Sequence, residues 1–311
     1  MIRARAALLG RLRVFFAAAG VLEVETPILS QSAVTDPALT SLVVGGSEIG
    51  RGRALYLQTS PEFPMKRLLA SGSGPIYQIC KVFRDDERGR FHHPEFSLLE
   101  WYRPGWNQHR LMDEVADLVQ VALRQPALSV ERISYRELFL AGLDLDPWSA
   151  TIEDLRATAL TAGIADAAHL ELEADAWLDL LLTHCLESGL GRGGMTFLYD
   201  YPPSQAALAR IRPGPIPVAE RFELYLEGIE LANGFCELTD TVEQRARFQA
   251  DLETRQRRGQ SAPPLDERLL AALTSGMPEC AGVALGLDRL LMIAGGVDQI
   301  DAVLTFPLER A

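Results

Sequence analysis

The sequence predicts an α+β fold in which an antiparallel β-sheet is flanked by helices. Strand-like segments at 54–60, 75–84 and 96–102 follow one another through short connections, which favours antiparallel pairing. Helical patterns stand at the start, in the middle and at the end of the chain. The sequence contains no βαβ series, G-x-G-x-x-G motif or Walker A loop, so a nucleotide site would have to be built in another way.

The N-terminal elements follow from local patterns. Residues 3–19 are amphipathic and predict a helix that ends near Gly20. VLEVETPIL (21–29) predicts a strand that runs into Pro27. We interpret residues 1–311 as a single domain. Its later elements are a helix at 108–124, an Ala/Leu-rich helical insert at about 126–190, strands at 195–201 and 221–238, helices at 240–258 and 265–275, and a strand that turns into a helix over 282–295.

Composition excludes several classes of protein. No apolar run is long enough to cross a bilayer and no signal peptide is visible, so we expect a cytoplasmic protein without membrane contact. The four cysteines form no CxxC pair, which argues against a zinc site. A net charge of −12 disfavours a large nucleic-acid surface. Residues 66–110 nevertheless hold eight Lys/Arg against five acids, a local balance that suits a nucleotide triphosphate.

The segment 76–102 predicts a strand, a charged loop and a returning strand. Arg84 ends the first strand, and its planar fork suits phosphate oxygens. On the second strand a period of two places Phe96, Glu100 and Tyr102 on one face. Such a face suits a nucleotide and an amino acid. Taken alone, the pattern also fits a charged hairpin with surface ion pairs.

A second pattern lies in FELYLEGIELANGFCELTD (222–240). Asn233-Gly234 is a strong hairpin signal, and a turn there would pair Glu230 with Glu237. Like charges opposite one another destabilise a sheet, so a cation between them is expected, and Mg²⁺ accompanying ATP is the natural choice. The alternative is an exposed edge where solvent screens the repulsion.

Two further segments have both a functional and a structural interpretation. Ser60-Pro61-Glu62 predicts a helix start, in which Glu62 either binds substrate or only complements the helix dipole. In GVALGLDRLLMIAG (282–295), Arg289 at the start of a helix can reach a terminal phosphate. A core helix with an aspartate cap is the alternative there.

Together these segments resemble class II aminoacyl-tRNA synthetases. VLEVETPIL is similar to motif 1 of that family, FRDDERGRFHHPEF to motif 2 and GLDRLLM to motif 3. TSPE with MKRLL, HHPEFSLLEWY and GIELANGFCEL resemble the lysine-activating subtype. Motif 1 begins about twenty residues in, which leaves no room for an anticodon-binding domain. The chain is therefore similar to the truncated paralogs that ligate lysine, preferably (R)-β-lysine, to elongation factor P.

The resemblance implies a role for each matching residue. Asp86 and His93 depart from the residues usual in the family, and Ala284 matches the paralogs rather than the lysyl enzymes. The implied catalytic residues are Arg84, Arg289 and Glu237; the ATP-binding residues are Arg84, Asp85, Asp86, His93, Phe96, Glu230, Leu231, Gly286 and Arg289; the substrate-binding residues are Ser60, Pro61, Glu62, Tyr102, Glu237 and Ala284; and the metal ligands are Glu230 and Glu237.

The resemblance also implies ATP and Mg²⁺ as cofactors, elongation factor P as acceptor, a homodimer formed through motif 1, and no tRNA partner. Two other functions compete with this one. An enzyme that charges tRNA would bind bulk tRNA, which the acidic charge disfavours. A non-catalytic regulatory paralog would lack at least one charged motif residue, yet Arg84, Glu230, Glu237 and Arg289 are all present.

Overall fold

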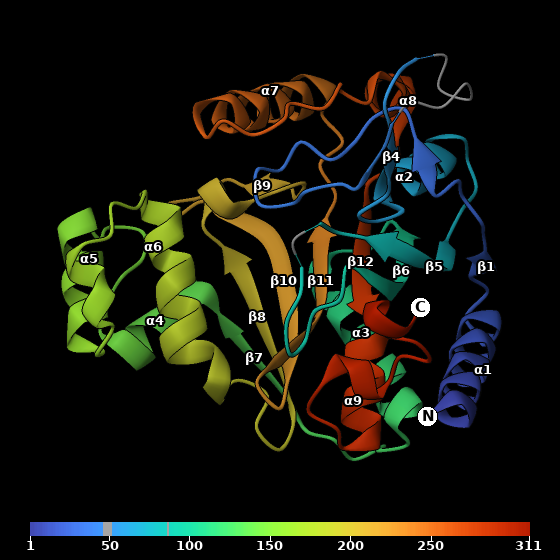
Figure 1. Ribbon diagram of the computed structural model, residues 1–311, viewed down its shortest axis with the longest axis horizontal. Coiled ribbons are helices and arrows are strands. Elements are labelled where there is room, and N and C mark those ends of the chain that lie inside the picture. The colour runs from blue at the N-terminus through green and yellow to red at the C-terminus, as the bar shows by residue number, and fades with distance from the viewer. Residues whose placement is uncertain (46–51, 86) are drawn as a thin grey trace. The chain divides into compact units, whose positions relative to one another are not determined.

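The chain folds into two compact units (Figure 1). Its computed structural model describes residues 1–45, 52–85 and 87–311. Unit 1 consists of Met1–Arg124 and Glu237–Ala311, and unit 2 consists of Gln125–Cys236. The chain therefore leaves unit 1 once and returns to it.

The sheet of unit 1 has the strand order β1-β5-β6-β12. β5 (Ile76–Phe83), β6 (Glu95–Pro104) and β12 (Cys280–Gly286) are antiparallel neighbours, as predicted, whereas β1 (Leu22–Glu23) runs parallel to β5. A smaller sheet joins β2 (Leu29–Ser30), β4 (Leu55–Leu57) and β3 (Val43–Val44). The unit thus has a mostly antiparallel framework.

The segment 21–29 is less regular than the single strand predicted for it. Its start pairs with β5 as β1, whereas Leu29 pairs with Leu57 of the smaller sheet. Pro27 lies between the two pairings and has no N–H to donate to a ladder. The segment therefore passes from one sheet to the other.

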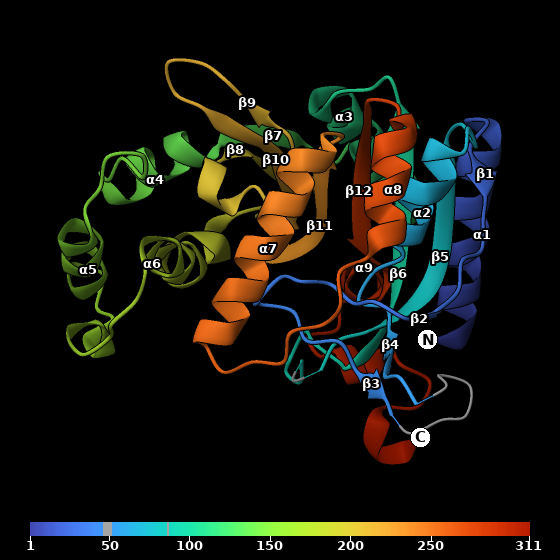
Figure 2. The same ribbon diagram turned by 90° about the horizontal axis from the view of Figure 1, so that it is seen from above.

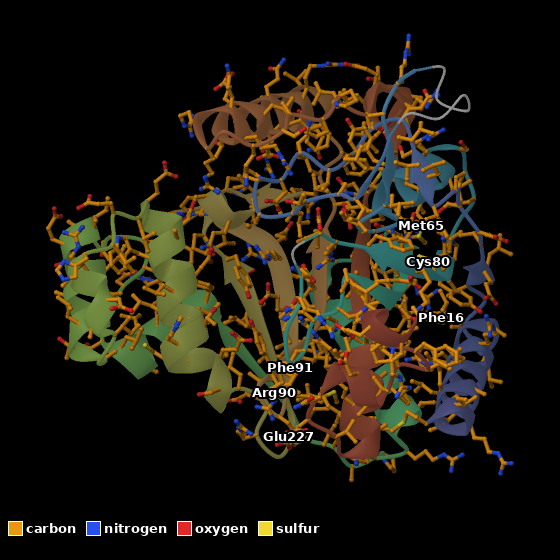
Figure 3. The ribbon with its side chains drawn as sticks, in the orientation of Figure 1. Phe16, Met65, Cys80, Arg90, Phe91 and Glu227 are labelled. Carbon is orange, nitrogen blue, oxygen red and sulfur yellow. The ribbon has the colours of Figure 1, made fainter. Side chains whose placement is uncertain are left out.

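Helices pack against these sheets. α1 (Ile2–Ala18) buries Phe16, labelled in Figure 3, whose ring stacks on Tyr77 of β5 with ring centroids 4.3 Å apart. α2 (Glu62–Ala70) lies beside α8 (Glu267–Gly276), as both ribbon views show (Figures 1 and 2). The other helices of the unit are α3 (Gln108–Leu123), α7 (Thr241–Arg257) and α9 (Leu287–Gly295), with short 3-10 turns at Ile300–Ala302 and Leu308–Arg310.

Unit 2 combines a sheet with a helical layer. Its strands are ordered β11-β10-β8-β7, and β9 (Ile211–Arg212) adds to β10. They comprise β7 (Val130–Ser134), β8 (Met195–Tyr201), β10 (Val218–Leu226) and β11 (Ile229–Cys236). The helices are α4 (Tyr135–Leu143), α5 (Ile152–Thr161) and α6 (Ala174–Leu181), with a 3-10 turn at Ala165–Ala168, a π turn at Leu182–Leu186, and 3-10 turns at Glu187–Gly189 and Pro203–Gln205.

The prediction of a helical insert at about 126–190 is wrong at its start. Val130–Ser134 forms strand β7, which pairs in parallel with β8. Val130 and Ile133 are β-branched and so favour a strand, and each pairs with a residue of β8 that lies 65 positions further along the chain. The rest of the insert is helical and buries a core that includes Tyr135, Phe139 and Trp177.

Candidate active site

The hairpin β5–β6 places the first group of predicted residues together. Its register runs without a break from Ile76–Tyr102 to Phe83–Glu95, so Phe96, Glu100 and Tyr102 share one face as predicted. Arg84 follows β5, and its guanidinium carbon lies 5.0 Å from the centre of the Phe96 ring. A planar cation beside an aromatic ring suits the phosphate and the base of a nucleotide.

Arg84 also contacts the segment that leads into α2. Its Nε donates to the carbonyl oxygen of Thr59 at 3.4 Å, one residue before Ser60. α2 begins at Glu62 with Pro61 at its N-cap position, one residue later than the predicted start, and the Glu62 N–H donates to Ser60 Oγ at 3.0 Å. The predicted phosphate and amino-acid contacts are therefore neighbours within unit 1.

Three glutamates gather beside this helix start around a buried lysine. Lys66 lies one turn beyond Glu62 on α2, and its Nζ is 2.5 Å from Glu62 Oε1 and 2.6 Å from Glu237 Oε2. The side chains of Lys66 and Glu237 are each 1% exposed. Glu100 is equally enclosed: its Oε2 accepts from Ser60 Oγ at 2.6 Å and its Oε1 from the Tyr102 hydroxyl at 2.7 Å.

Burial dominates the protonation behaviour of Glu100 and Glu237. Desolvation raises the pKa of Glu100 to about 7, helped by the negative charge of Glu62. Desolvation likewise raises the pKa of Glu237 to about 8, and the ammonium of Lys66 opposes that rise. Burial would lower the pKa of Lys66, but Glu237 and Glu62 outweigh it and the pKa is raised. The cluster thus holds three carboxyl groups against one fixed cation, an arrangement suited to receiving a second cation.

β12 pairs with β6 next to this cluster. Gly282 pairs with Tyr102 and Ala284 with Glu100. A Cβ at Gly282 would lie 2.3 Å from a carbon of the Tyr102 ring and 2.5 Å from Glu237 Oε1. The absent side chain is therefore what allows Tyr102 and Glu237 to approach each other.

Motif 3 presents its arginine at the start of α9. Gly286 is the N-cap residue of this helix, and Asp288 accepts from the Ser97 N–H at 2.6 Å, which ties the helix to β6. Arg289 contacts the loop between β5 and β6: its Nη2 is 2.7 Å from His92 Nε2 and its Nε donates to the Phe91 carbonyl at 3.3 Å. Burial and the charge of Arg289 lower the pKa of His92.

Two other predicted residues of the motif 2 loop, Asp85 and His93, contact backbone groups. His93 is buried, with Nδ1 2.6 Å from the Glu95 carbonyl oxygen and Nε2 accepting from the Leu308 N–H at 3.1 Å. Both ring nitrogens thus face backbone groups, so its proposed contact with ATP rests on the resemblance alone. The Asp85 N–H donates to the Thr40 carbonyl at 2.8 Å. Asp86 lies outside the described residues.

The predicted hairpin turn at Asn233-Gly234 is wrong. β10 and β11 are joined at Glu227-Gly228, whose φ angles of 55° and 73° are typical of a two-residue turn between twisted strands. Asn233 instead lies within β11 and pairs with Glu223. The partner of Glu230 is therefore Tyr225, so the argument for a cation between paired Glu230 and Glu237 falls.

The corrected register identifies another acid in unit 2. Glu223 and Tyr225 share a face of β10, and Glu230 opposite Tyr225 lies on that same face. Glu223 accepts from Arg221 Nη2 at 2.5 Å and from the Tyr225 hydroxyl at 2.6 Å. Leu231, a predicted ATP contact, is buried on β11.

Sequence reasoning missed several residues of these clusters. Lys66 had a usable signal, because it stands four residues after Glu62 in a predicted helix. Glu100 was placed on the functional face but given no role. Glu223 was missed because the turn was predicted at the wrong position. His92 was missed because its neighbour His93 was predicted instead.

A hairpin carrying Arg84 beside Phe96, and a strand-to-helix segment carrying Arg289, define a catalytic fold of the class II synthetase type. In agreement, the model of the family "tRNA synthetases class II (D, K and N)" matches residues 1–310. The chain belongs to this family, whose members are ATP-dependent and AMP-forming.

Similar proteins cover nearly the whole chain. It is 50% identical over 312 residues to the elongation factor P–(R)-beta-lysine ligase of Vibrio cholerae, spanning 100% of this chain and 96% of that protein. The ligases of the same name from Pectobacterium atrosepticum and Proteus mirabilis are each 50% identical, over 99% of this chain and 94% of theirs. Within the residues that the structure describes, no helix is long and apolar enough to cross a membrane.

Proposed function

We propose that this enzyme activates lysine, preferably (R)-β-lysine, as its adenylate and transfers it to a lysine side chain of elongation factor P. The observation that carries the proposal is the cluster of Glu62, Glu100 and Glu237, in which Glu62 and Glu237 contact the cation Lys66 and Glu100 accepts from Ser60 and Tyr102. The side-chain ammonium of the substrate would be the second cation, and its arrival would favour the ionised forms of Glu100 and Glu237, whose pKa values burial raises. The names of the full-length relatives support the same substrate and acceptor.

The first step needs positioning and charge neutralisation rather than a protein nucleophile. The substrate carboxylate, already ionised at pH 7, attacks the α-phosphorus of ATP in line, and the bond to the β-phosphate oxygen breaks to release pyrophosphate. Arg84 would hold the α-phosphate and Phe96 would stack on adenine. Arg289, beside His92, would hold the terminal phosphates.

In the second step an amine of the acceptor attacks the carbonyl carbon of the adenylate. The acceptor lysine must first lose a proton, because only the neutral amine is nucleophilic. An amide bond forms, the bond from carbonyl carbon to phosphate oxygen breaks, and AMP leaves. Ser60, Glu62, Tyr102 and Glu237 would hold the amino acid during both steps.

Mg²⁺ is proposed as the ion that accompanies ATP. It commonly binds through one or two carboxylates together with substrate phosphates and would neutralise phosphate charge. Glu223 and Glu230 lie on one face of the β10–β11 hairpin and would supply carboxylates of that kind. The described residues hold no group of three or more His, Cys, Asp or Glu side chains that could bind a metal by themselves. Glu237, the other predicted ligand, has its Oε2 against Lys66.

A homodimer belongs to the same proposal. Large apolar side chains on and near the predicted motif 1 segment are exposed, as expected for a surface that a second copy covers. They include Val14, Leu22, Ile28, Leu29 and Val43. A molar mass near twice 34.2 kDa in light scattering would support the dimer. A cytoplasmic location is also proposed, since ATP and translation factors are found there.

The test is mass spectrometry of purified elongation factor P after incubation with the enzyme and ATP. One reaction contains (R)-β-lysine, a second contains α-lysine, and a third replaces elongation factor P with bulk tRNA. We expect one added lysyl mass on the protein, formed faster with (R)-β-lysine, and no charged tRNA. Charged tRNA together with unmodified elongation factor P would replace this proposal with that of a tRNA-charging enzyme.

A further inference from the structure

Lys66 is an unusual cation because it lies inside the amino-acid site and yet is enclosed by protein. Its side chain is 1% exposed, and its Nζ lies 2.5 Å from Glu62 Oε1 and 2.6 Å from Glu237 Oε2. These two acids come from distant parts of the chain, one from α2 and one from the segment that follows β11. Lys66 could therefore affect substrate binding without contacting the substrate.

The two oxygens of Glu237 have different surroundings. Oε2 forms an ion pair with Lys66. Oε1 faces the Cα of Gly282, and a Cβ added to this glycine would lie 2.5 Å from Oε1. The same Cβ position lies 2.3 Å from the Tyr102 ring. The Glu237 N–H donates to the Cys280 carbonyl at 2.9 Å, which fixes the backbone beside β12. Oε1 and the edge of the Tyr102 ring thus lie together above the Cα of Gly282.

We propose that Lys66 is a positioning residue for the substrate ammonium. Its Nζ holds Glu237 Oε2 in place. Oε1 then stays over Gly282, where it accepts a hydrogen bond from the side-chain ammonium of the bound substrate. The inference rests on the proposed function, and it adds a residue to the specificity of that same site. A charge-assisted hydrogen bond is strong when its geometry is fixed, and Lys66 provides that geometry without occupying the substrate position.

The enclosure of Lys66 explains how one carboxylate could serve two cations. A substrate ammonium that competed for Oε2 would have to displace a buried, doubly paired ammonium, and this would leave that charge uncompensated. Binding at Oε1 keeps both pairs. Specificity for a cationic side chain would therefore depend on Lys66, although Lys66 itself has the same charge as the substrate group.

The experiment measures lysine-dependent exchange of pyrophosphate into ATP for wild type and Lys66→Met. Norleucine serves as the analogue that lacks the side-chain ammonium. Misplacing a group by about 1 Å can cost on the order of 100-fold, so we expect the KM for lysine to rise roughly 10- to 100-fold. The KM for ATP should change less than about twofold, and the preference for lysine over norleucine should fall about tenfold. A purely structural role would weaken both amino acids and ATP together, and that result would overturn the proposal.

The matched control is Lys81→Met on β5. Lys81 lies 3.5 Å from Glu95 in a surface pair whose side chains are 43% and 49% exposed. Removing this charge should leave the KM for lysine and the preference over norleucine unchanged. A Lys81 variant that lost the preference as strongly as Lys66→Met would show a general effect of charge and would contradict the assignment.

A crystal structure of the wild-type enzyme with lysine keeps the proposal testable if Lys66→Met does not fold. We expect the ligand ammonium within hydrogen-bond distance of Glu237 Oε1 while Lys66 Nζ stays on Oε2. A ligand ammonium on Oε2, or one distant from Glu237, would refute the positioning role. Absence of lysine-dependent exchange in wild type would instead refute the proposed function, which separates the two failures.

Discussion

Replacing Gly282 by alanine tests the geometry of the amino-acid site with a single methyl group. The new Cβ would lie 2.3 Å and 2.4 Å from two carbons of the Tyr102 ring and 2.5 Å from Glu237 Oε1. Non-bonded carbon atoms prefer about 3.5–4.0 Å, so the ring or the carboxylate must move by about 1 Å. Tyr102 is 2% exposed and donates to Glu100 at 2.7 Å, and Glu237 is tied to Lys66 at 2.6 Å. Neither group can move without losing a buried contact.

Overpacking of this kind typically costs about 1–3 kcal/mol. If the strain falls on the substrate-bound state, the KM for lysine in pyrophosphate exchange should rise roughly 5- to 150-fold, while the KM for ATP stays nearly constant. Gly10→Ala in α1 is the matched control, because a Cβ there meets nothing within 4 Å. A Gly282→Ala enzyme with wild-type lysine KM and melting temperature would show that Tyr102 and Glu237 do not meet above this glycine.

Three further predictions test other parts of unit 1. Arg289→Ala should abolish lysine-dependent pyrophosphate exchange and leave the melting temperature nearly unchanged; wild-type exchange would remove Arg289 from the nucleotide site. Glu114→Ala should destabilise the fold by about 3–5 kcal/mol in denaturant unfolding, because it leaves Arg103 buried without its carboxylate; a loss below about 1 kcal/mol would contradict this pairing. Glu100 has a pKa raised by burial from 4.5 to about 7, so its protonated form favours folding, and this contribution to stability is lost as pH rises from about 4.5 through 7. Glu100→Gln should flatten the decline in melting temperature over that range, and an unchanged slope would assign the decline to other groups.

Much of the fold was predictable because the local signals and the tertiary packing agree. The amphipathic pattern of residues 3–19 matches α1, and the apolar runs around the motif 2 loop match β5 and β6. β7 was missed because its partner β8 lies far along the chain, so no local periodicity distinguishes it from the helices that follow.

The turn between β10 and β11 shows how two local signals compete. Asn233-Gly234 is the stronger hairpin signal by sequence, yet the turn falls at Glu227-Gly228. β8 begins at Met195, which pairs with Leu226, so the ladder on the other edge of β10 ends at Leu226 and the chain turns directly after it. Pairing on both sides of β10 outweighs the preference of one dipeptide.

The sequence by itself determined the class of fold, the family resemblance and the face of β6 that carries Phe96, Glu100 and Tyr102, because these depend on residue order and on a period of two. Only the tertiary structure decided which acids share a site. Two contacts join residues that are up to 180 positions apart in the sequence: Lys66 with Glu62 and Glu237, and Tyr102 with Gly282. Such contacts depend on how distant segments pack, and burial then sets their charge, which no local pattern encodes.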